Sequence, residues 1–371
     1  MAPAGVDSRN ATAQNRLTMR WRILILAGVA VAAVAAPSAA SAESSVTGYP
    51  SYLAAAGDSI TRAYDADSVY PPGERLQYSW ATGTSSTVDS IYLRLLAANP
   101  AISGQVSNDA ATGAKMSDLQ GQLQNAVLQH AQEVVILMGA NDVCTSTEAS
   151  MTPVATFKSE FTSAMTALSH GLPDARIYVL SIPSVYRLWQ VLHTNSAARF
   201  VWAAAGICQS MLANPTSTAA ADVARRAAVL QREKQFNTQL QSVCARYVHC
   251  KFDGDVVFNY PYTAADANTL DYFHPSITGQ TTLASEAWAH GFDFSDLTPP
   301  VSAATFTPVT GGASVSISAT DAAGVSGIEY KIGSGFYKRY TGPVTVATGK
   351  TITWRSVDVN GNIEATQSHT V

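Results

Sequence analysis

The residues Tyr52-Leu53-Ala54-Ala55-Ala56-Gly57-Asp58-Ser59-Ile60-Thr61 decide the fold of this chain. They begin with a short apolar run, which is typical of a parallel strand that is buried on both faces. Gly57 allows the chain to turn sharply after this strand. Ser59 therefore falls at the carboxyl end of the predicted strand, where open α/β sheets bind their ligands. Taken alone, Gly-Asp-Ser is a weak signal, because turns are rich in these residue types.

Predicted helices and strands alternate after this first strand. The apolar spacing predicts helices over 88–98, 119–127, 157–168 and 222–244, with a last one from about Thr278. Apolar runs predict strands at 134–138, at 176–182 and near Lys251-Phe252. This alternation predicts a parallel sheet with helices on both faces.

An apolar insert over 186–215 interrupts the alternation. Its aromatic residues, which include Trp189 and Trp202, could line a pocket for an acyl chain. Aromatic residues at such spacing are more often part of a core, and the sequence leaves both interpretations open.

The pattern changes near Ser295. The residues Leu297-Thr298-Pro299-Pro300 have the composition of a stiff linker, and no helical periodicity follows them. Apolar and polar residues alternate in three later stretches, at 314–318, 327–331 and 351–355. This alternation predicts a small antiparallel β-sandwich. We therefore expect one domain over 48–296, a linker over 297–303 and a second domain over 304–371.

The N-terminus has the pattern of a secretory signal peptide. A basic region precedes a short apolar run and an Ala-x-Ala end, formed by Arg16, Arg20, Arg22, residues 23–36, Ala40 and Ala42. We expect residues 1–42 to be removed after Ala42 and the rest to be exported, with Met19 as an alternative start. A membrane anchor is the other interpretation, but the apolar run is short for a membrane span.

The charge of the chain limits its partners. The expected mature chain carries 19 basic and 26 acidic residues, which gives a net charge of −7, and it contains no basic run. Nucleic acids and anionic membrane surfaces are therefore poor candidates as partners.

Four cysteines in an exported chain predict two disulfides. The short spacing of Cys244 and Cys250 favours a local bond, which leaves Cys144 with Cys208. All three pairings stay possible from the sequence. A metal site is the alternative, but no Cys-x-x-Cys or paired histidine spacing supports it, so we expect no metal and no cofactor.

Three further stretches fall at the edges of predicted strands and helices. Residues 108–115 form a loop before a helix, where the backbone N–H of Gly113 could donate a hydrogen bond. The residues Gly139-Ala140-Asn141-Asp142 follow a strand, and the side-chain amide of Asn141 could also donate. Asp271 and His274 lie three residues apart in a turn before the last helix.

Together with Ser59, these stretches meet the requirements of acyl transfer to a serine. His274 would take the proton of Ser59, and Asp271 would hold the imidazole and stabilise its charged form. The N–H groups of Ser59 and Gly113 and the amide of Asn141 would bind the developing oxyanion. Each residue also has a structural interpretation, as a turn glycine, a helix cap or a surface imidazole. The occurrence of all four stretches in this order favours catalysis.

These stretches resemble the four sequence blocks of the SGNH (GDSL-type) hydrolases. The matching residues are Gly57-Asp58-Ser59, Gly113, Gly139-Ala140-Asn141-Asp142 and Asp271-x-x-His274, and the resemblance covers about residues 52–292. It implies a flavodoxin-like three-layer α/β/α fold. It also implies that Ser59 is the nucleophile of a triad with Asp271 and His274, and that Gly113 and Asn141 are oxyanion donors.

Two finer resemblances concern the source of the enzyme and its C-terminal domain. Gly-Ala-Asn-Asp-Val-Cys at 139–144 and Gly-Ile-Cys at 206–208 look closest to secreted actinobacterial esterases or lipases. Thr112 stands where family members often have serine, which leaves the assignment of Gly113 standing. Residues 321–330 and 356–362 look like bacterial immunoglobulin-like (Ig-like) repeats, which act as spacers or as wall-binding or substrate-binding units.

The residues and the resemblance together predict an exported serine esterase or lipase that forms an acyl-enzyme. A phospholipase and a carbohydrate deacetylase are the alternatives within the family. A surface-binding protein without activity is the alternative from another class, and the intact Ser59, Asp271 and His274 argue against it. The expected partner is an ester substrate, with a polysaccharide or cell-wall contact if the C-terminal domain binds sugar. We expect a monomer.

Overall fold

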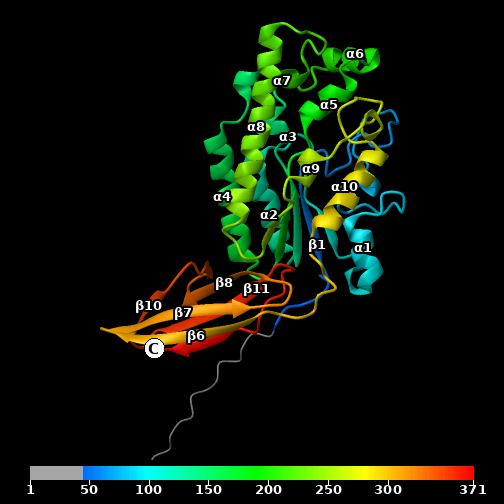
Figure 1. The fold of residues 1–371 in the computed structure, drawn as a ribbon. Helices are drawn as coiled ribbons and strands as arrows, with labels where there is room; N and C mark the ends of the chain where they lie inside the picture. The colour runs from blue at the N-terminus through cyan, green and yellow to red at the C-terminus, as the bar shows by residue number, and fades with distance from the viewer. Residues whose placement is uncertain (1–44) are drawn as a thin grey trace, which may run out of the picture. The chain divides into compact units, whose positions relative to one another are not determined.

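The computed structural model describes residues 45–371, so the expected signal peptide over 1–42 lies outside the described residues. The described residues fall within one compact unit. They contain one parallel and two antiparallel sheets (Figure 1). No helix in residues 45–371 is both long enough and apolar enough to cross a membrane.

A five-stranded parallel sheet carries the N-terminal part of the described chain. Its order is β2-β1-β3-β4-β5. The strands are β1 (Leu53–Gly57), β2 (Val106–Asn108), β3 (Glu133–Leu137), β4 (Arg176–Val179) and β5 (Cys250–Phe252). Every residue of β1, β3 and β4 is buried, as their apolar runs predict. The strand β2 was not predicted from the sequence, because this edge strand is only three residues long, Val-Ser-Asn, and is half-buried.

Helices cover both faces of this sheet (Figure 1). One side carries α2 (Leu119–Leu128), α4 (Val154–Gly171) and α8 (Ala220–Cys244). The other side carries α1 (Ile91–Ala98) and α10 (Ile277–His290). The three layers and the strand order confirm the predicted flavodoxin-like α/β/α fold.

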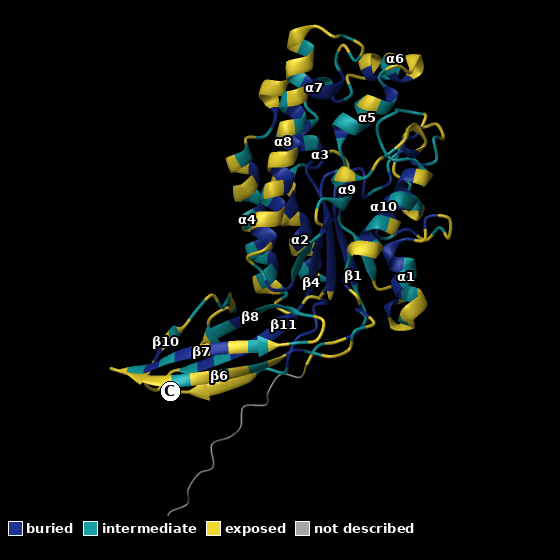
Figure 2. Ribbon diagram, in the orientation of Figure 1, coloured by how far each residue is buried: buried dark blue, intermediate teal, exposed yellow. Residues whose placement is uncertain are grey.

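Apolar side chains hold the three layers together. Buried residues gather along the sheet and on the helix faces that point toward it (Figure 2). On α4, for example, Phe157, Phe161, Met165 and Leu168 are buried at spacings of three or four residues, which places them on one face. Phe157 also stacks on Phe236 of α8, with ring centroids 3.9 Å apart.

The apolar insert folds into three helices between β4 and α8. They are α5 (Val185–Leu192), α6 (Ser196–Ala204) and α7 (Gln209–Leu212). Trp202 of α6 is fully buried, in line with a core role, whereas Phe200 on the same helix is 74% exposed. Two other short helices lie near the carboxyl edge of the sheet, α3 (Ala140–Val143) and α9 (Val256–Asn259).

Two disulfides brace this part of the chain. Cys144, directly after α3, is bonded to Cys208 beside α7, and Cys244 at the end of α8 is bonded to Cys250 at the start of β5. These are the pairs that the sequence favoured. The first bond ties the insert to the C-terminal end of α3, the helix that carries Asn141.

The C-terminal residues form two antiparallel sheets, which confirms the predicted all-β domain. One sheet has the order β10-β7-β6 and the other β12-β11-β8-β9. Their strands are β6 (Val301–Val309), β7 (Gly312–Thr320), β8 (Val325–Ile332), β9 (Lys338–Arg339), β10 (Val344–Ala347), β11 (Thr351–Asp358) and β12 (Gln367–Thr370). The three predicted strands lie within β7, β8 and β11. The apolar core includes Val315, Ile328, Ile352 and Trp354.

Buried charges connect this domain to the amino edge of the parallel sheet. Glu329 of β8 accepts a hydrogen bond from Arg355 of β11 at 2.7 Å and lies 3.0 Å from Nε2 of His249, which precedes β5. Arg355 also pairs with Asp174, just before β4, at 2.6 Å. Glu329, Arg355 and His249 are all nearly inaccessible to solvent. The C-terminal strands therefore contact the α/β part through His249 and Asp174, which pair with the buried side chains of Glu329 and Arg355.

Candidate active site

Three neighbouring strands end together beside Ser59. β1 pairs with β2 on one side and with β3 on the other, so that Ala55 lies opposite Asn108 and Gly57 opposite Leu137. Ser59 follows β1, the loop with Gly113 follows β2, and Asn141 follows β3. Because the carboxyl ends of parallel strands meet at one edge of a sheet, these residues are brought together from distant parts of the sequence.

Only glycine fits at the turn before the nucleophile. Gly57 has a φ of +156°, and a Cβ atom there would lie 2.4 Å from the carbonyl oxygen of Leu137 and 2.5 Å from Oγ1 of Thr61. Asp58 follows, fully buried, and its Oδ1 accepts the N–H of Ile60 at 2.9 Å. Burial raises the pKa of Asp58 to about 6. The turn is thus closed around Ser59 by β3 and by the Asp58 side chain.

Ser59, His274 and Asp271 form a continuous chain of hydrogen bonds. Oγ of Ser59 lies 2.8 Å from Nε2 of His274, and Nδ1 of His274 lies 2.5 Å from Oδ2 of Asp271. With the imidazole proton on Nδ1 and donated to Asp271, Nε2 is free to accept the hydroxyl proton of Ser59. The structure therefore brings together the three residues that the sequence singled out for a triad.

Asp271 is held as a charged group. Burial by itself would raise the pKa of Asp271, but the hydrogen bond and the positive charge that His274 can supply outweigh it and keep that pKa below its usual range. The backbone N–H groups of Phe273 and His274 also donate to Oδ1 of Asp271, at 2.8 and 3.0 Å. Hydrogen bonds donated to a carboxylate stabilise its ionised form. An ionised Asp271 can then stabilise the imidazole of His274 when that ring is protonated.

The segments after β1, β2 and β3 carry the three expected oxyanion donors, which are the N–H groups of Ser59 and Gly113 and the side-chain amide of Asn141. Within residues 45–371, neither the N–H of Ser59 nor that of Gly113 donates a hydrogen bond. The side-chain amide of Asn141 donates to the carbonyl of Ala114 at 3.0 Å, and Asp142 accepts the N–H of Met116 at 3.0 Å. These two bonds fix the Gly113 loop against α3.

Two buried side-chain amides that were not predicted from the sequence hold the site in place. Gln280 of α10 donates to the carbonyl of Ile60 at 2.8 Å and accepts the N–H of Trp80 at 2.9 Å, which fixes the helix after His274 to the segment after Ser59. Asn268 is fully buried and bonds to both Asp271 and His274. No motif marks either residue, since each acts on groups that only the fold brings near.

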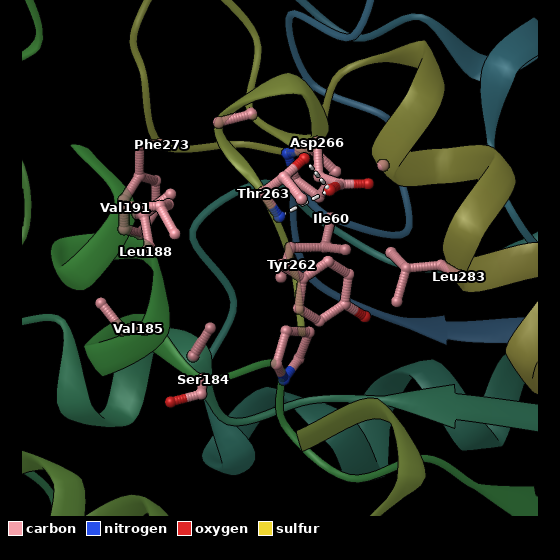
Figure 3. A pocket seen from close by; sticks show the side chains of 15 residues that line it. Ile60, Ser184, Val185, Leu188, Val191, Tyr262, Thr263, Asp266, Phe273 and Leu283 are labelled. Atoms are coloured by element: carbon pink, nitrogen blue, oxygen red, sulfur yellow. Dashed lines mark hydrogen bonds between the residues drawn. The ribbon is translucent and has the colours of Figure 1, made fainter. Parts of the chain in front are cut away.

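An apolar pocket lies beside the segments that carry Ser59 and His274, and Figure 3 shows its lining residues. Part of its lining comes from chain neighbours of the site residues, namely Ile60, Ala140, Phe273 and Pro275. The insert supplies another wall through Val185, Leu188 and Val191 of α5. In Figure 3, Phe273, Leu188 and Val191 lie close together on one side, Leu283 lies on the other, and Tyr262 lies between them. The insert therefore lines this pocket through aliphatic residues of α5. Its aromatic residues Trp189 and Trp202 are not among the lining residues, and Trp202 of α6 packs in the core.

The described residues contain one group of acidic side chains that could hold a metal ion. It consists of Asp296, Asp321 and Asp358, whose carboxylate oxygens lie within 4.8 Å of one another. Asp358 already accepts hydrogen bonds from Asn360 and Asn362. Asp321 and Asp358 belong to the C-terminal strand region, apart from the residues around Ser59, and the chemistry of a serine nucleophile needs no metal.

Comparison with known proteins gives a family for most of the α/β part. Residues 53–287 match the sequence profile described as GDSL-like Lipase/Acylhydrolase. No curated protein matches the chain.

Several solved structures are similar to this part of the chain. An acetyl xylan esterase is 15% identical and covers 64% of this chain and 98% of its own, with a TM-score of 0.38. The extracellular lipase of Streptomyces rimosus is 16% identical and covers 64% and 98%, with a TM-score of 0.37. A family two carbohydrate esterase from Clostridium thermocellum, in complex with cellohexaose, is 16% identical. The match covers 64% of this chain and 62% of the esterase, with a TM-score of 0.38.

Proposed function

The chain belongs to the GDSL-like lipase/acylhydrolase family, and on that premise we propose that it is an exported serine esterase or lipase. Membership supports hydrolysis of esters. The observation that carries the finer proposal is the unbroken chain from Oγ of Ser59 through the imidazole of His274 to Oδ2 of Asp271, with distances of 2.8 and 2.5 Å. Such a chain activates a serine hydroxyl for attack on a carbonyl carbon.

The reaction follows from the positions of these groups. Oγ of Ser59 attacks the carbonyl carbon of the ester while Nε2 of His274 takes the hydroxyl proton. The N–H groups of Ser59 and Gly113 and the amide of Asn141 bind the negative charge on the carbonyl oxygen. His274 then gives its proton to the departing alcohol, which leaves the acyl group on Oγ. Water attacks the acyl carbon, His274 takes its proton and returns one to Oγ, and the carboxylic acid leaves.

The apolar pocket favours substrates with an acyl chain longer than acetyl. Its lining is dominated by aliphatic and aromatic side chains and adjoins the residues on either side of His274. Each methylene group removed from water contributes about 0.8 kcal/mol, so a pocket of this kind rewards chain length. An acetyl group would leave the pocket unfilled, which is the physical distinction between a lipase-like enzyme and a carbohydrate deacetylase.

Export and the role of the C-terminal domain are further parts of the proposal. The signal-like N-terminus over 1–42 and the two disulfides both suit an oxidising compartment outside the cell. Contact of an Ig-like C-terminal domain with polysaccharide or cell wall, and a monomeric state, stay predictions. Sequencing of the N-terminus of protein from a culture supernatant should read Glu43 first, and a chain that stays in the cell would contradict export.

The first experiment measures hydrolysis of p-nitrophenyl esters from acetate to palmitate. Ser59→Ala should abolish turnover and labelling by a fluorophosphonate, because the variant lacks the hydroxyl that we propose forms the acyl-enzyme. Ser90→Ala is the matched control, since Ser90 is also buried but only caps α1 and donates to the carbonyl of Gly83. Equal rates for the wild-type protein and Ser59→Ala would overturn the proposed function.

The chain-length preference has its own test in α5. Leu188→Trp should fill part of the pocket and lower kcat/KM for octanoate by about tenfold to a hundredfold, the equivalent of two or three methylene groups, with little effect on acetate. Leu128→Trp, at a site that is 77% exposed, is the control for the same substitution. A wild-type rate confined to acetate would instead favour the deacetylase.

A further inference from the structure

Asn268 is the first residue of the loop that carries Asp271 and His274. We propose that its side chain is a positioning residue for the reaction, because it determines which oxygen of Asp271 faces the imidazole. This inference rests on the proposed function, since it concerns the same triad. Asn268 itself touches neither the hydroxyl of Ser59 nor any reacting atom, so its effect is exerted through Asp271 and His274.

The hydrogen bonds of Asn268 span the whole loop. Its Nδ2 donates to Oδ1 of Asp271 at 2.8 Å and to the carbonyl of His274 at 3.0 Å. Its Oδ1 accepts the N–H groups of Leu270 and Asp271 at 2.8 and 2.9 Å. Its backbone N–H also donates to the carbonyl of His274, at 3.0 Å. The side chain therefore binds both ends of the segment between itself and His274.

This pattern leaves one oxygen of Asp271 for the imidazole. Oδ1 accepts from three donors, which are Nδ2 of Asn268 and the N–H groups of Phe273 and His274. Oδ2 is directed to Nδ1 of His274. Without the Asn268 donor, Oδ1 would lose its only side-chain partner, and rotation of the carboxylate would meet less resistance.

The loop needs such a support because regular secondary structure does not hold it. The residues between Asn268 and Pro275 belong to no helix or strand, and Tyr272 has a φ of +55°, in the left-handed region. Besides the bonds of Asn268 and Asp271, the indole N–H of Trp202 donates to the carbonyl of Tyr272 at 3.1 Å. Only asparagine offers a donor and an acceptor at this distance from the backbone, as aspartate lacks the donor and alanine lacks both.

Another buried asparagine gives a matched control. Asn362 is equally inaccessible, and its Nδ2 also donates to one carbonyl and one aspartate, the carbonyl of Asp296 at 3.1 Å and Oδ2 of Asp358 at 2.8 Å. It lies in the C-terminal domain and has no bond to the triad. Asn362→Ala and Asn268→Ala therefore remove similar bonds, and only the second removes them from the active site.

The test compares full-length wild type, Asn268→Ala, Asn268→Asp and Asn362→Ala on one p-nitrophenyl ester. We expect Asn268→Ala to lower kcat at least tenfold with less than a threefold change in KM, because misplacing the general base affects the chemical step. Asn362→Ala should keep kcat within about twofold at a temperature well below its melting point. Melting curves show that each variant is folded during the assay.

The pH profile separates positioning from mere stability. In Asn268→Asp, a second carboxylate beside Asp271 favours the protonated imidazole, so the acidic limb of kcat/KM should move to higher pH by about one unit. Loss of stability alone would leave this limb in place. Unchanged kcat and an unchanged acidic limb in folded Asn268 variants would overturn the inference.

The outcome for Asn268 can be told apart from the outcome for the proposed function. If Ser59→Ala is inactive and the Asn268 variants match the wild type, only the positioning role fails. If Ser59→Ala is as active as the wild type, the proposed function fails, and with it the inference that rests on it.

Discussion

Glu233 gives a quantitative test of the packing behind the pocket. This residue of α8 is fully buried, and its Oε1 accepts the N–H of Val185, the first residue of α5, at 2.8 Å. Among the described residues, Oε2 has no hydrogen-bond partner. Burial raises the pKa of Glu233 to about 8, although hydrogen bonds from the backbone of Val185 and Tyr186 oppose the shift. We therefore expect this carboxyl group to be protonated at neutral pH.

The raised pKa of Glu233 makes the free energy of unfolding depend on pH. The folded chain binds this proton more tightly than the unfolded chain, in which the pKa is near 4.5. The contribution of the group is thus complete below about pH 4.5 and is lost as the pH rises toward 8. The free energy of unfolding then falls by at most about 1.4 kcal/mol per pH unit because of this group. Between pH 5.5 and 7.5 the loss amounts to about 2.7 kcal/mol.

The substitution Glu233→Gln isolates the pH-dependent contribution of this carboxyl group to the free energy of unfolding. Glutamine keeps the volume and the acceptor for Val185 but has no proton to lose. The melting temperature of the variant relative to the wild type should therefore rise by about 5 °C between pH 5.5 and 7.5, at about 2 °C per kcal/mol for a chain of this size. Thermal unfolding followed by circular dichroism measures this difference in melting temperature. Glu148→Gln, at an exposed site, is the control. If the melting temperatures of the variant and the wild type differ by the same amount at pH 5.5 and 7.5, the pKa of Glu233 is not raised by burial and the prediction is wrong.

Three further predictions concern the site and the C-terminal domain. Asn141→Ala should lower kcat by ~10²–10³ in steady-state assays with little change in KM, as the loss of one oxyanion donor does; a rate within threefold of wild type would remove Asn141 from the oxyanion site. Gly57→Ala should cost several kcal/mol or prevent folding, because its Cβ would lie 2.4 Å from the carbonyl oxygen of Leu137; a normal melting curve would contradict this. Glu329→Gln should cost about 3–5 kcal/mol of stability by removing a buried carboxylate partner of Arg355. Its kcat at 25 °C should stay unchanged, and a stable variant in urea unfolding would show that the ion pair contributes little.

The sequence was informative wherever a short segment carries its own signal. The apolar runs of β1, β3 and β4 predicted buried parallel strands, and the spacing of Phe157 and its neighbours predicted α4. The alternation in 314–318, 327–331 and 351–355 likewise predicted strands of the C-terminal domain. In each case the apolar residues follow the pattern of a single helix or strand. The element can therefore be predicted from its own residues, without knowledge of distant ones.

The candidate site was predictable in part for the same reason. Ser59, Asn141 and the pair Asp271 and His274 each follow or precede an element whose end the sequence marks. The sequence could place them at edges of the fold, and the parallel sheet then accounts for their meeting. Their catalytic roles stay predictions, for which Ser59→Ala and Asn141→Ala are the tests.

Other features were decided by tertiary structure. Asn268 and Gln280 look like ordinary polar residues until the fold buries them against the segments of His274 and Ser59. In the sequence, Glu233 is one of several charged residues on a polar helix. Its pKa is raised because the fold buries its carboxyl group. The edge strand β2 is recognisable only by its pairing with β1. Local patterns determine which segments become helices and strands, whereas the burial and the hydrogen-bond partners of a polar side chain depend on residues that the chain brings together only when it folds.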